Sequence, residues 1–147
     1  RKTTPGLRML EKHAVRVGGG HNHRFSLADG ILIKDNHIQA AKGITNAVNA
    51  ARRRAPFTLK IEVETETLAQ VLEALDVKAD IIMLDNMTTE QMKEAVALID
   101  HRAIVEASGN MAQRDIREVA SVGVDCISIG DLTNSVQPLD ISLKLKI

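Results

Sequence analysis

Short apolar runs alternate with amphipathic segments along most of this chain, at intervals of about 21 residues. The apolar runs predict buried strands at 31–33, 58–64, 81–84, 103–106 and 126–129. Between them, apolar side chains recur every three or four residues, as on one face of an α-helix. This alternation predicts parallel strands joined by right-handed helical crossovers, in a βα barrel or an open doubly wound sheet.

The expected helices cover 6–17, 44–54, 68–75, 92–99 and 116–120. Gly18-Gly19-Gly20 ends the first of them, and Thr88 with Gln91 forms a capping box before the fourth. We expect Asn110 to cap the last helix and the residues 34–37 to form a polar loop. A chain of 147 residues is long enough for one domain, which we place at 1–147.

The composition argues against several kinds of protein. The longest apolar runs have about four residues, whereas a membrane helix needs roughly 20, so we expect no membrane partner. The single cysteine, Cys126, cannot form an internal disulfide or a cysteine-based zinc site, which favours a reducing cytoplasm. With no Trp, no Tyr and two Phe, the chain lacks the platforms on which single-stranded nucleic acids stack. We therefore expect no nucleic-acid partner.

The formal net charge of zero conceals an uneven distribution. The first 24 residues hold six basic residues, three histidines and one acidic residue. Such a segment fits either a nucleic-acid arm or one wall of a pocket for a polyanionic small molecule. His21, His23 and His37 could in principle bind a metal, but the neighbouring Arg24 and Lys34 would oppose a cation. These basic side chains instead favour a carboxylate or a phosphate.

Three acidic residues follow the same periodicity. Glu64, Asp85 and Glu106 are separated by 21 positions each and stand at the expected ends of successive strands. In parallel α/β folds the carboxyl ends of the strands form the rim of the active site, so we expect these carboxylates to converge there. The alternative is that they only begin the following helices, where the helix dipole favours negative charge.

Small residues follow the last two strands. Ser108-Gly109-Asn110 lies between a strand and a helix, and Gly130 stands at the corresponding place one unit later. Free backbone N–H groups at such positions can hold a phosphate, and in βα barrels the loops after the final two strands commonly do so. Each glycine could equally serve only as a turn residue.

Six motifs together resemble the C-terminal domain of quinolinate phosphoribosyltransferase, also called nicotinate-nucleotide pyrophosphorylase. In chain order the motifs are Arg1-Lys2-Thr3-Thr4-Pro5-Gly6-Leu7-Arg8, Gly18-Gly19-Gly20-His21-Asn22-His23-Arg24, Ile33-Lys34-Asp35-Asn36-His37, Glu62-Val63-Glu64, Met83-Leu84-Asp85-Asn86 and Glu106-Ala107-Ser108-Gly109-Asn110. The resemblance implies an incomplete TIM-like parallel α/β barrel. It also implies transfer of phosphoribose from phosphoribosyl pyrophosphate to quinolinate, with release of CO2 and pyrophosphate, in NAD biosynthesis.

The resemblance assigns a role to each matching residue. Lys2, Glu64 and Asp85 would be catalytic, with Lys2 at the pyrophosphate donor and both acids at the ribose hydroxyls and at Mg²⁺. The quinolinate carboxylates would be held by Arg1, His23, Arg24 and Lys34. The 5′-phosphate would be held by Ser108, Gly109 and Gly130.

The family also leads us to expect more chain than is present here. An N-terminal domain and a first barrel strand would precede Arg1, and a neighbouring subunit of a homodimer or higher homo-oligomer would close the site. We therefore expect these 147 residues to be weakly active or inactive alone. The remaining alternative is a catalytically silent anion-binding or assembly module derived from the same barrel.

Overall fold

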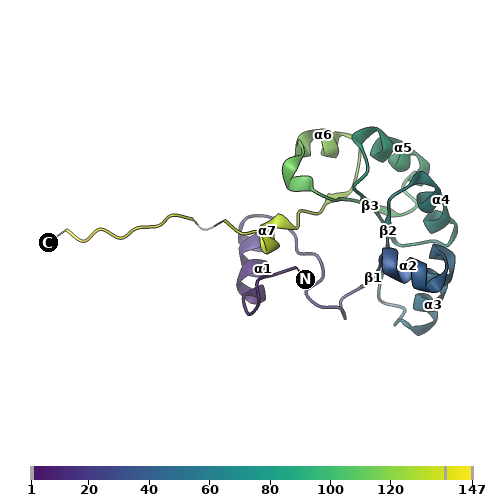
Figure 1. Ribbon diagram of the computed structural model, residues 1–147, viewed down its shortest axis with the longest axis horizontal. Helices are drawn as coiled ribbons and strands as arrows, with labels where there is room; N and C mark the ends of the chain where they lie inside the picture. Colours follow the sequence, from purple (N-terminus) through teal and green to yellow (C-terminus); the bar gives the residue numbers. More distant parts are fainter. Residues whose placement is uncertain (1, 138, 147) are drawn as a thin grey trace.

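The computed structural model describes residues 2–137 and 139–146, which form a curved α/β layer (Figure 1). Within them, one parallel sheet has the strand order β1-β2-β3-β4-β5. Its strands are β1 (Ile31–Ile33), β2 (Ile61–Thr65), β3 (Ile81–Asp85), β4 (Ile104–Ser108) and β5 (Cys126–Ile127). Strands that follow one another in sequence also pair in space, whereas a doubly wound sheet reverses its order. The prediction of a partial, TIM-like barrel is confirmed.

Helices cover the convex side of this sheet. In Figure 1 helices α2 to α6 follow one another around the outer arc, while α1 and α7 lie beside each other on the opposite side. The α-helices are α1 (Arg8–Val17), α2 (Asp35–Ala41), α3 (Ile44–Arg54), α4 (Leu68–Asp76), α5 (Thr89–Ile99), α6 (Ile116–Ser121) and α7 (Asp131–Asn134). The predicted capping box of Thr88 and Gln91 is confirmed at the start of α5.

The hydrophobic core lies between the sheet and these outer helices. Alternate strand residues point to opposite faces of a sheet. The outward set is apolar and belongs to the core: Ile33, Ile61, Val63, Ile82, Leu84, Val105 and Ala107. The inward set on the three central strands carries most of the charge: Glu62, Glu64, Asp85 and Glu106. The concave face therefore carries polar groups, whereas the convex face carries the apolar core residues.

The strands are staggered, which changes the depth at which equally spaced residues lie. Glu64 pairs with Met83, and Met83 pairs with Glu106. Asp85, however, pairs with Ser108, the last residue of β4. The expectation that Glu106 ends its strand at the rim is therefore wrong, because it lies deeper on the concave face than Asp85 does.

Three local predictions are also wrong. The residues 35–37 form the first turn of α2 rather than a loop, and the Nδ1 atom of His37 accepts the backbone N–H of Lys34 at 2.9 Å. Asn110 does not cap the helix α6, because Asp115 accepts the N–H of Arg117 there. The last strand is shorter than expected, and α7 follows it.

The two ends of the described chain behave differently. The hydroxyl of Thr133 in α7 donates to the backbone oxygen of Lys2 at 2.8 Å, so the N-terminal segment lies against α7. The C-terminal segment extends away from the body of the protein (Figure 1). Its apolar residues alternate with polar ones, and all four are more than 80% exposed: Leu139, Ile141, Leu143 and Leu145. Each described helix is too short or too polar to span a membrane.

Candidate functional site

An ion pair joins the carboxyl ends of the first two strands. Lys34 follows β1, and its Nζ donates to Oε2 of Glu64 in β2 at 2.6 Å. The Glu64 side chain is 12% exposed and that of Lys34 is 42% exposed, so the carboxylate is largely shielded while the ammonium still reaches solvent. Both residues were predicted as site residues, and here they are in direct contact.

The carboxyl ends of β3 and β4 are joined through Asn86. Its backbone N–H donates to the Ser108 oxygen at 3.1 Å, and its side-chain amide donates to Oδ2 of Asp85 at 2.8 Å. Its Oδ1 accepts from the amide of Asn110 at 3.1 Å. This network holds Asp85 and Ser108 next to each other, as their pairing in the sheet also requires.

Gly109 packs directly against this network. Its φ of +90° lies in the left-handed region, and a Cβ there would come within 2.3 Å of Oδ1 and 2.6 Å of the backbone nitrogen of Asn86. A side chain at this position would therefore collide with backbone as well as with side-chain atoms. The close contact between the two turns explains the glycine independently of any phosphate.

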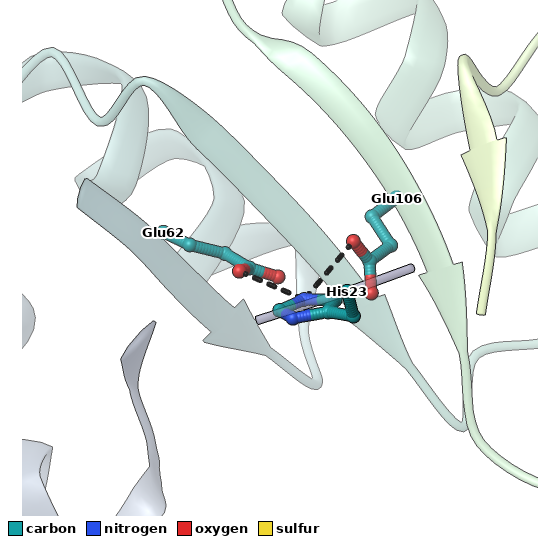
Figure 2. A group of neighbouring side chains, drawn as sticks. All are labelled: His23, Glu62 and Glu106. Carbon is teal, nitrogen blue, oxygen red and sulfur yellow. Dashed lines mark ion pairs between the residues drawn. The ribbon is translucent and has the colours of Figure 1, made fainter. Parts of the chain in front are cut away.

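A second polar cluster lies deeper on the concave face (Figure 2). The imidazole of His23 lies between two carboxylates, with Nε2 at 3.2 Å from Oε2 of Glu62 and 3.6 Å from Oε2 of Glu106. Both glutamates are about 95% buried, and the second oxygen of each has no hydrogen-bond partner among the described residues. Two buried acids in one cluster are costly unless they are paired or protonated.

The cluster changes the proton affinity of its members. The hydrogen bond to Glu62 raises the pKa of His23 above its ordinary value, although burial opposes this effect. Burial, together with the charge of Glu62, raises the pKa of Glu106. Partial desolvation and the neighbouring charge of Glu106 raise the pKa of Cys126 to about 11, so this thiol is a poor nucleophile near neutral pH although the residue is exposed.

These three side chains place possible metal-ligand atoms within 4.8 Å of one another. However, the backbone N–H of Arg24 donates to Nδ1 of His23 at 2.8 Å, so Nδ1 carries the lone pair and Nε2 carries the proton. A metal facing the carboxylates would need the lone pair on Nε2 instead. The hydrogen bonding therefore disfavours a metal ion at this cluster.

Arg24 lies beside the same cluster. Its guanidinium donates to the Gly30 oxygen at 2.8 Å, just before β1. With His23 it lines a cavity of about 320 Å³, whose other walls come from Asp29, the residues 58–60 and the first residues of β1 and β3. Arg24 thus lies toward the amino ends of the strands, His23 contacts the middle of the sheet, and Lys34 and Asp85 lie at the carboxyl ends.

The remaining predicted residues lie around the open side of the barrel. Lys2 is exposed and touches α7 through its backbone oxygen, and Gly130 is the residue before α7. Arg1 lies outside the described residues.

Sequence reasoning missed Glu62 and Asn86 as members of the site. Glu62 and Glu64 stand two positions apart in one strand, which puts both on the same face of the sheet. This spacing was a usable signal for a second inward carboxylate. The bridging contacts of Asn86 depend on how two turns meet and had no comparable signal.

The fold and the site together define a class: an α/β-barrel domain whose concave face carries carboxylates and basic groups suited to an anionic small molecule. A family model described as the C-terminal domain of quinolinate phosphoribosyl transferase matches residues 1–144. The chain belongs to this family.

Named relatives agree with this assignment. A protein of Bacillus subtilis named probable nicotinate-nucleotide pyrophosphorylase (carboxylating) is 50% identical over 143 residues, which are 97% of this chain and 50% of the relative. A human protein named nicotinate-nucleotide pyrophosphorylase (carboxylating) is 40% identical over 148 residues, 99% of this chain and 50% of the relative. The chain thus spans about half the length of these curated relatives.

Solved structures share the fold. The crystal structure of NadC from Streptococcus pyogenes is 49% identical with a TM-score of 0.88, over 98% of this chain and 50% of that one. A thiamine phosphate pyrophosphorylase from Pyrococcus furiosus has a TM-score of 0.57 at 21% identity, over 88% of this chain and 68% of that one, a likeness of fold alone.

Proposed function

We propose that this chain is the barrel domain of a quinolinate phosphoribosyltransferase. The whole enzyme transfers phosphoribose from phosphoribosyl pyrophosphate to the ring nitrogen of quinolinate and releases pyrophosphate and CO2, leaving nicotinate mononucleotide for NAD biosynthesis. The observation that carries the proposal is the Lys34–Glu64 pair at the barrel rim, in a member of this family. It puts an anion-binding group and a carboxylate within contact of the same ligand.

The rim carboxylates suit the first chemical step. When the bond from the ribose to pyrophosphate breaks, positive charge develops on the ribose, and the bond to the ring nitrogen forms on the same carbon. Glu64 and Asp85 would bind the ribose hydroxyls and stabilise this charge electrostatically. Lys2 would neutralise the departing pyrophosphate, and holding both substrates together lowers the entropic barrier.

The second step needs no further cofactor. Once the ring nitrogen is ribosylated it carries a positive charge. It can therefore stabilise the electron pair left on the ring when the adjacent carboxylate leaves as CO2, and a proton then replaces CO2 on that carbon. Arg1, His23, Arg24 and Lys34 would hold the two carboxylates of quinolinate for both steps.

Glu64 and Asp85 are suitable ligands for Mg²⁺, because this ion prefers carboxylate and water oxygens and is usually held by one or two carboxylates and substrate phosphates. The Glu64 side chain is largely shielded and Asp85 is partly exposed, both lie at or next to the ends of neighbouring strands, and their ligand atoms are oxygens only. When bound, Mg²⁺ would supply positive charge to the pyrophosphate leaving group. Ser108, Gly109 and Gly130 would face the 5′-phosphate at the next strand ends.

Calorimetric titration of phosphoribosyl pyrophosphate with Mg²⁺ into the chain tests the proposal. We expect binding that Asp85→Asn weakens by more than about tenfold, equivalent to 1.4 kcal/mol. The exposed Asp76 at the end of α4 offers a matched control, and Asp76→Asn should change nothing. Absence of binding at millimolar ligand would instead favour the silent anion-binding or assembly module.

We also propose that the active form is a cytoplasmic homo-oligomer. A cytoplasmic location fits a chain with one cysteine. Support for association comes from α1, whose apolar residues Met9, Leu10 and Val17 are each at least 67% exposed. Sedimentation at micromolar concentration would test it, and a monomer at all concentrations would contradict it.

A further inference from the structure

Both ring nitrogens of His23 contact polar groups. Nε2 faces the carboxylates of Glu62 and Glu106 at 3.2 and 3.6 Å, and Nδ1 accepts the backbone N–H of Arg24 at 2.8 Å. The bond to Nδ1 requires a lone pair there, so the ring proton sits on Nε2 and points toward the carboxylates. The imidazole is thus fixed in position and in tautomer by groups on β2, on β4 and on its own backbone.

The segment that carries His23 is also held from α1. Lys12, which is 7% exposed, donates from Nζ to the His23 oxygen at 3.0 Å. The side chain of Asn22 donates to the Lys12 oxygen at 2.8 Å. Residues 22–24 therefore bridge α1 and the concave face of the sheet, and the imidazole is the contact on the sheet side (Figure 2).

The position of Arg24 depends on the contacts of His23. Its backbone N–H is bound to the imidazole, and its guanidinium reaches the Gly30 oxygen along the wall of the 320 Å³ cavity. A ring that moved away from the glutamates would take the Arg24 backbone with it. The location of the Arg24 side chain therefore depends on the carboxylates of Glu62 and Glu106, which hold the His23 ring.

Two features argue that this arrangement serves more than packing. Glu62 and Glu106 are almost fully buried, and within 2–137 and 139–146 each has one carboxylate oxygen without a hydrogen-bond partner. Apolar residues of similar size would avoid that cost. Polar groups that violate the rules of stable packing are commonly found at functional sites.

We propose that Glu62, together with Glu106, is a positioning residue that acts through His23 to hold Arg24 in place for the dicarboxylate substrate. The inference rests on the proposed function for the identity of that substrate. The inference adds to the proposed function a role for Glu62 in quinolinate affinity, which is separate from the binding of phosphoribosyl pyrophosphate.

The geometry can be tested without any substrate. Long-range ¹H–¹⁵N correlation spectra of the ¹⁵N-labelled chain, recorded at a pH high enough for neutral imidazoles, should show the His23 ring with its proton on Nε2 and none on Nδ1. His23→Gln should remove that signal, whereas His13→Gln on the exposed face of α1 should not. Glu62→Leu should shift it. A neutral His23 ring that carries its proton on Nδ1 would overturn the proposal.

Binding measurements then test the consequence. Glu62→Leu should weaken quinolinate binding about tenfold and Glu62→Gln, which keeps an oxygen acceptor, by less than about threefold. Affinity for phosphoribosyl pyrophosphate with Mg²⁺ should remain unchanged in both variants, as it should in the surface control Glu94→Gln. A purely structural role would weaken both ligands together, and that result would contradict the positioning role.

The results distinguish a failure of the proposed function from a failure of the positioning role. If the unmodified chain binds neither ligand, the proposed function fails, and the imidazole spectra still decide whether Glu62 fixes His23. If the chain binds quinolinate and Glu62→Leu binds it equally well, only the positioning role is wrong. Circular dichroism of each variant establishes that it is folded.

Discussion

Lys34 and Glu64 meet at 2.6 Å between the carboxyl ends of two adjacent strands, so the barrel rim holds a paired cation and anion before any ligand arrives. An incoming carboxylate must share the ammonium with Glu64, and an incoming ribose must share the carboxylate with Lys34. The pair therefore couples the two halves of the proposed site through one direct contact.

Replacing Lys34 by Met separates the binding role of this pair from its structural role. Because the Lys34 side chain is 42% exposed, loss of the ion pair should cost less than about 1 kcal/mol of unfolding free energy. Quinolinate binding should weaken more than about tenfold, since a charge-assisted hydrogen bond is lost. Urea denaturation and calorimetry measure the two effects, with Lys93→Met on exposed α5 as the control. Unchanged quinolinate affinity would argue against Lys34 as a ligand.

Gly109 and Gly6 provide a matched pair for testing the contact between the rim turns. Both have a positive φ, but a Cβ on Gly6 would meet no described residue within 4 Å, whereas one on Gly109 would meet Asn86 at 2.3 Å. Gly6→Ala should cost about 1 kcal/mol from backbone strain alone. Gly109→Ala should cost more than about 3 kcal/mol, because backbone atoms must also move. Equal costs in urea unfolding would show that the contact contributes nothing.

Glu106 should make stability depend on pH in a defined direction. Because its pKa is raised by burial and then by Glu62, the folded protein holds this proton more tightly than the unfolded chain does. Its stabilising contribution is fully present below the ordinary value of 4.5 and is lost as the pH rises through the folded pKa.

Glu106→Gln removes this titration while keeping the shape of the side chain. The unfolding free energy of the natural protein, measured relative to the variant, should therefore fall as the pH is raised from about 4 to about 8. Denaturant unfolding of both proteins at a series of pH values measures this difference. A difference that grows with pH would mean that the pKa of Glu106 is lowered rather than raised.

The alkylation rate of Cys126 tests the raised pKa of this thiol beside Glu106. A pKa raised from 9.0 to about 11 reduces the thiolate fraction at pH 8 about a hundredfold. Alkylation by iodoacetamide should therefore be about a hundredfold slower in the folded chain than in urea, where the same single thiol is unperturbed. Glu106→Gln should speed the folded reaction, because Glu106 Oε2 lies 3.9 Å from the sulfur. Equal rates in the folded and unfolded chain would contradict the raised pKa.

The sequence predicted those parts of the fold that depend on local patterns. The central strands and their helices follow from runs of apolar residues and from capping residues such as Thr88, all of which act within a few positions. The family resemblance is also confirmed. The roles assigned to Lys2, Glu64, Asp85 and the phosphate loops remain predictions.

The depth of the acidic residues could not be predicted in the same way. Glu106 faces Met83 rather than Asp85, because the stagger between strands is set by how neighbouring strands pair. The start of α2 was also not predicted, because it depends on a side-chain contact. The sequence 34–37 is typical of a loop, but the His37 ring satisfies the Lys34 N–H and lets a helix begin at once.

The apolar core and the charged concave face lie on opposite sides of the sheet, so ligand binding and folding depend on different residues. Glu62, Glu64, Asp85 and Glu106 lie on the opposite face of the strands from the core residues Val63, Ile82 and Leu84. Evolution can therefore alter ligand chemistry on one side of each strand while selection for folding acts on the other. Changes at the partly exposed Glu64 and Asp85 should cost less stability than changes at the buried Glu62 and Glu106, which makes the barrel rim a suitable place for directed evolution.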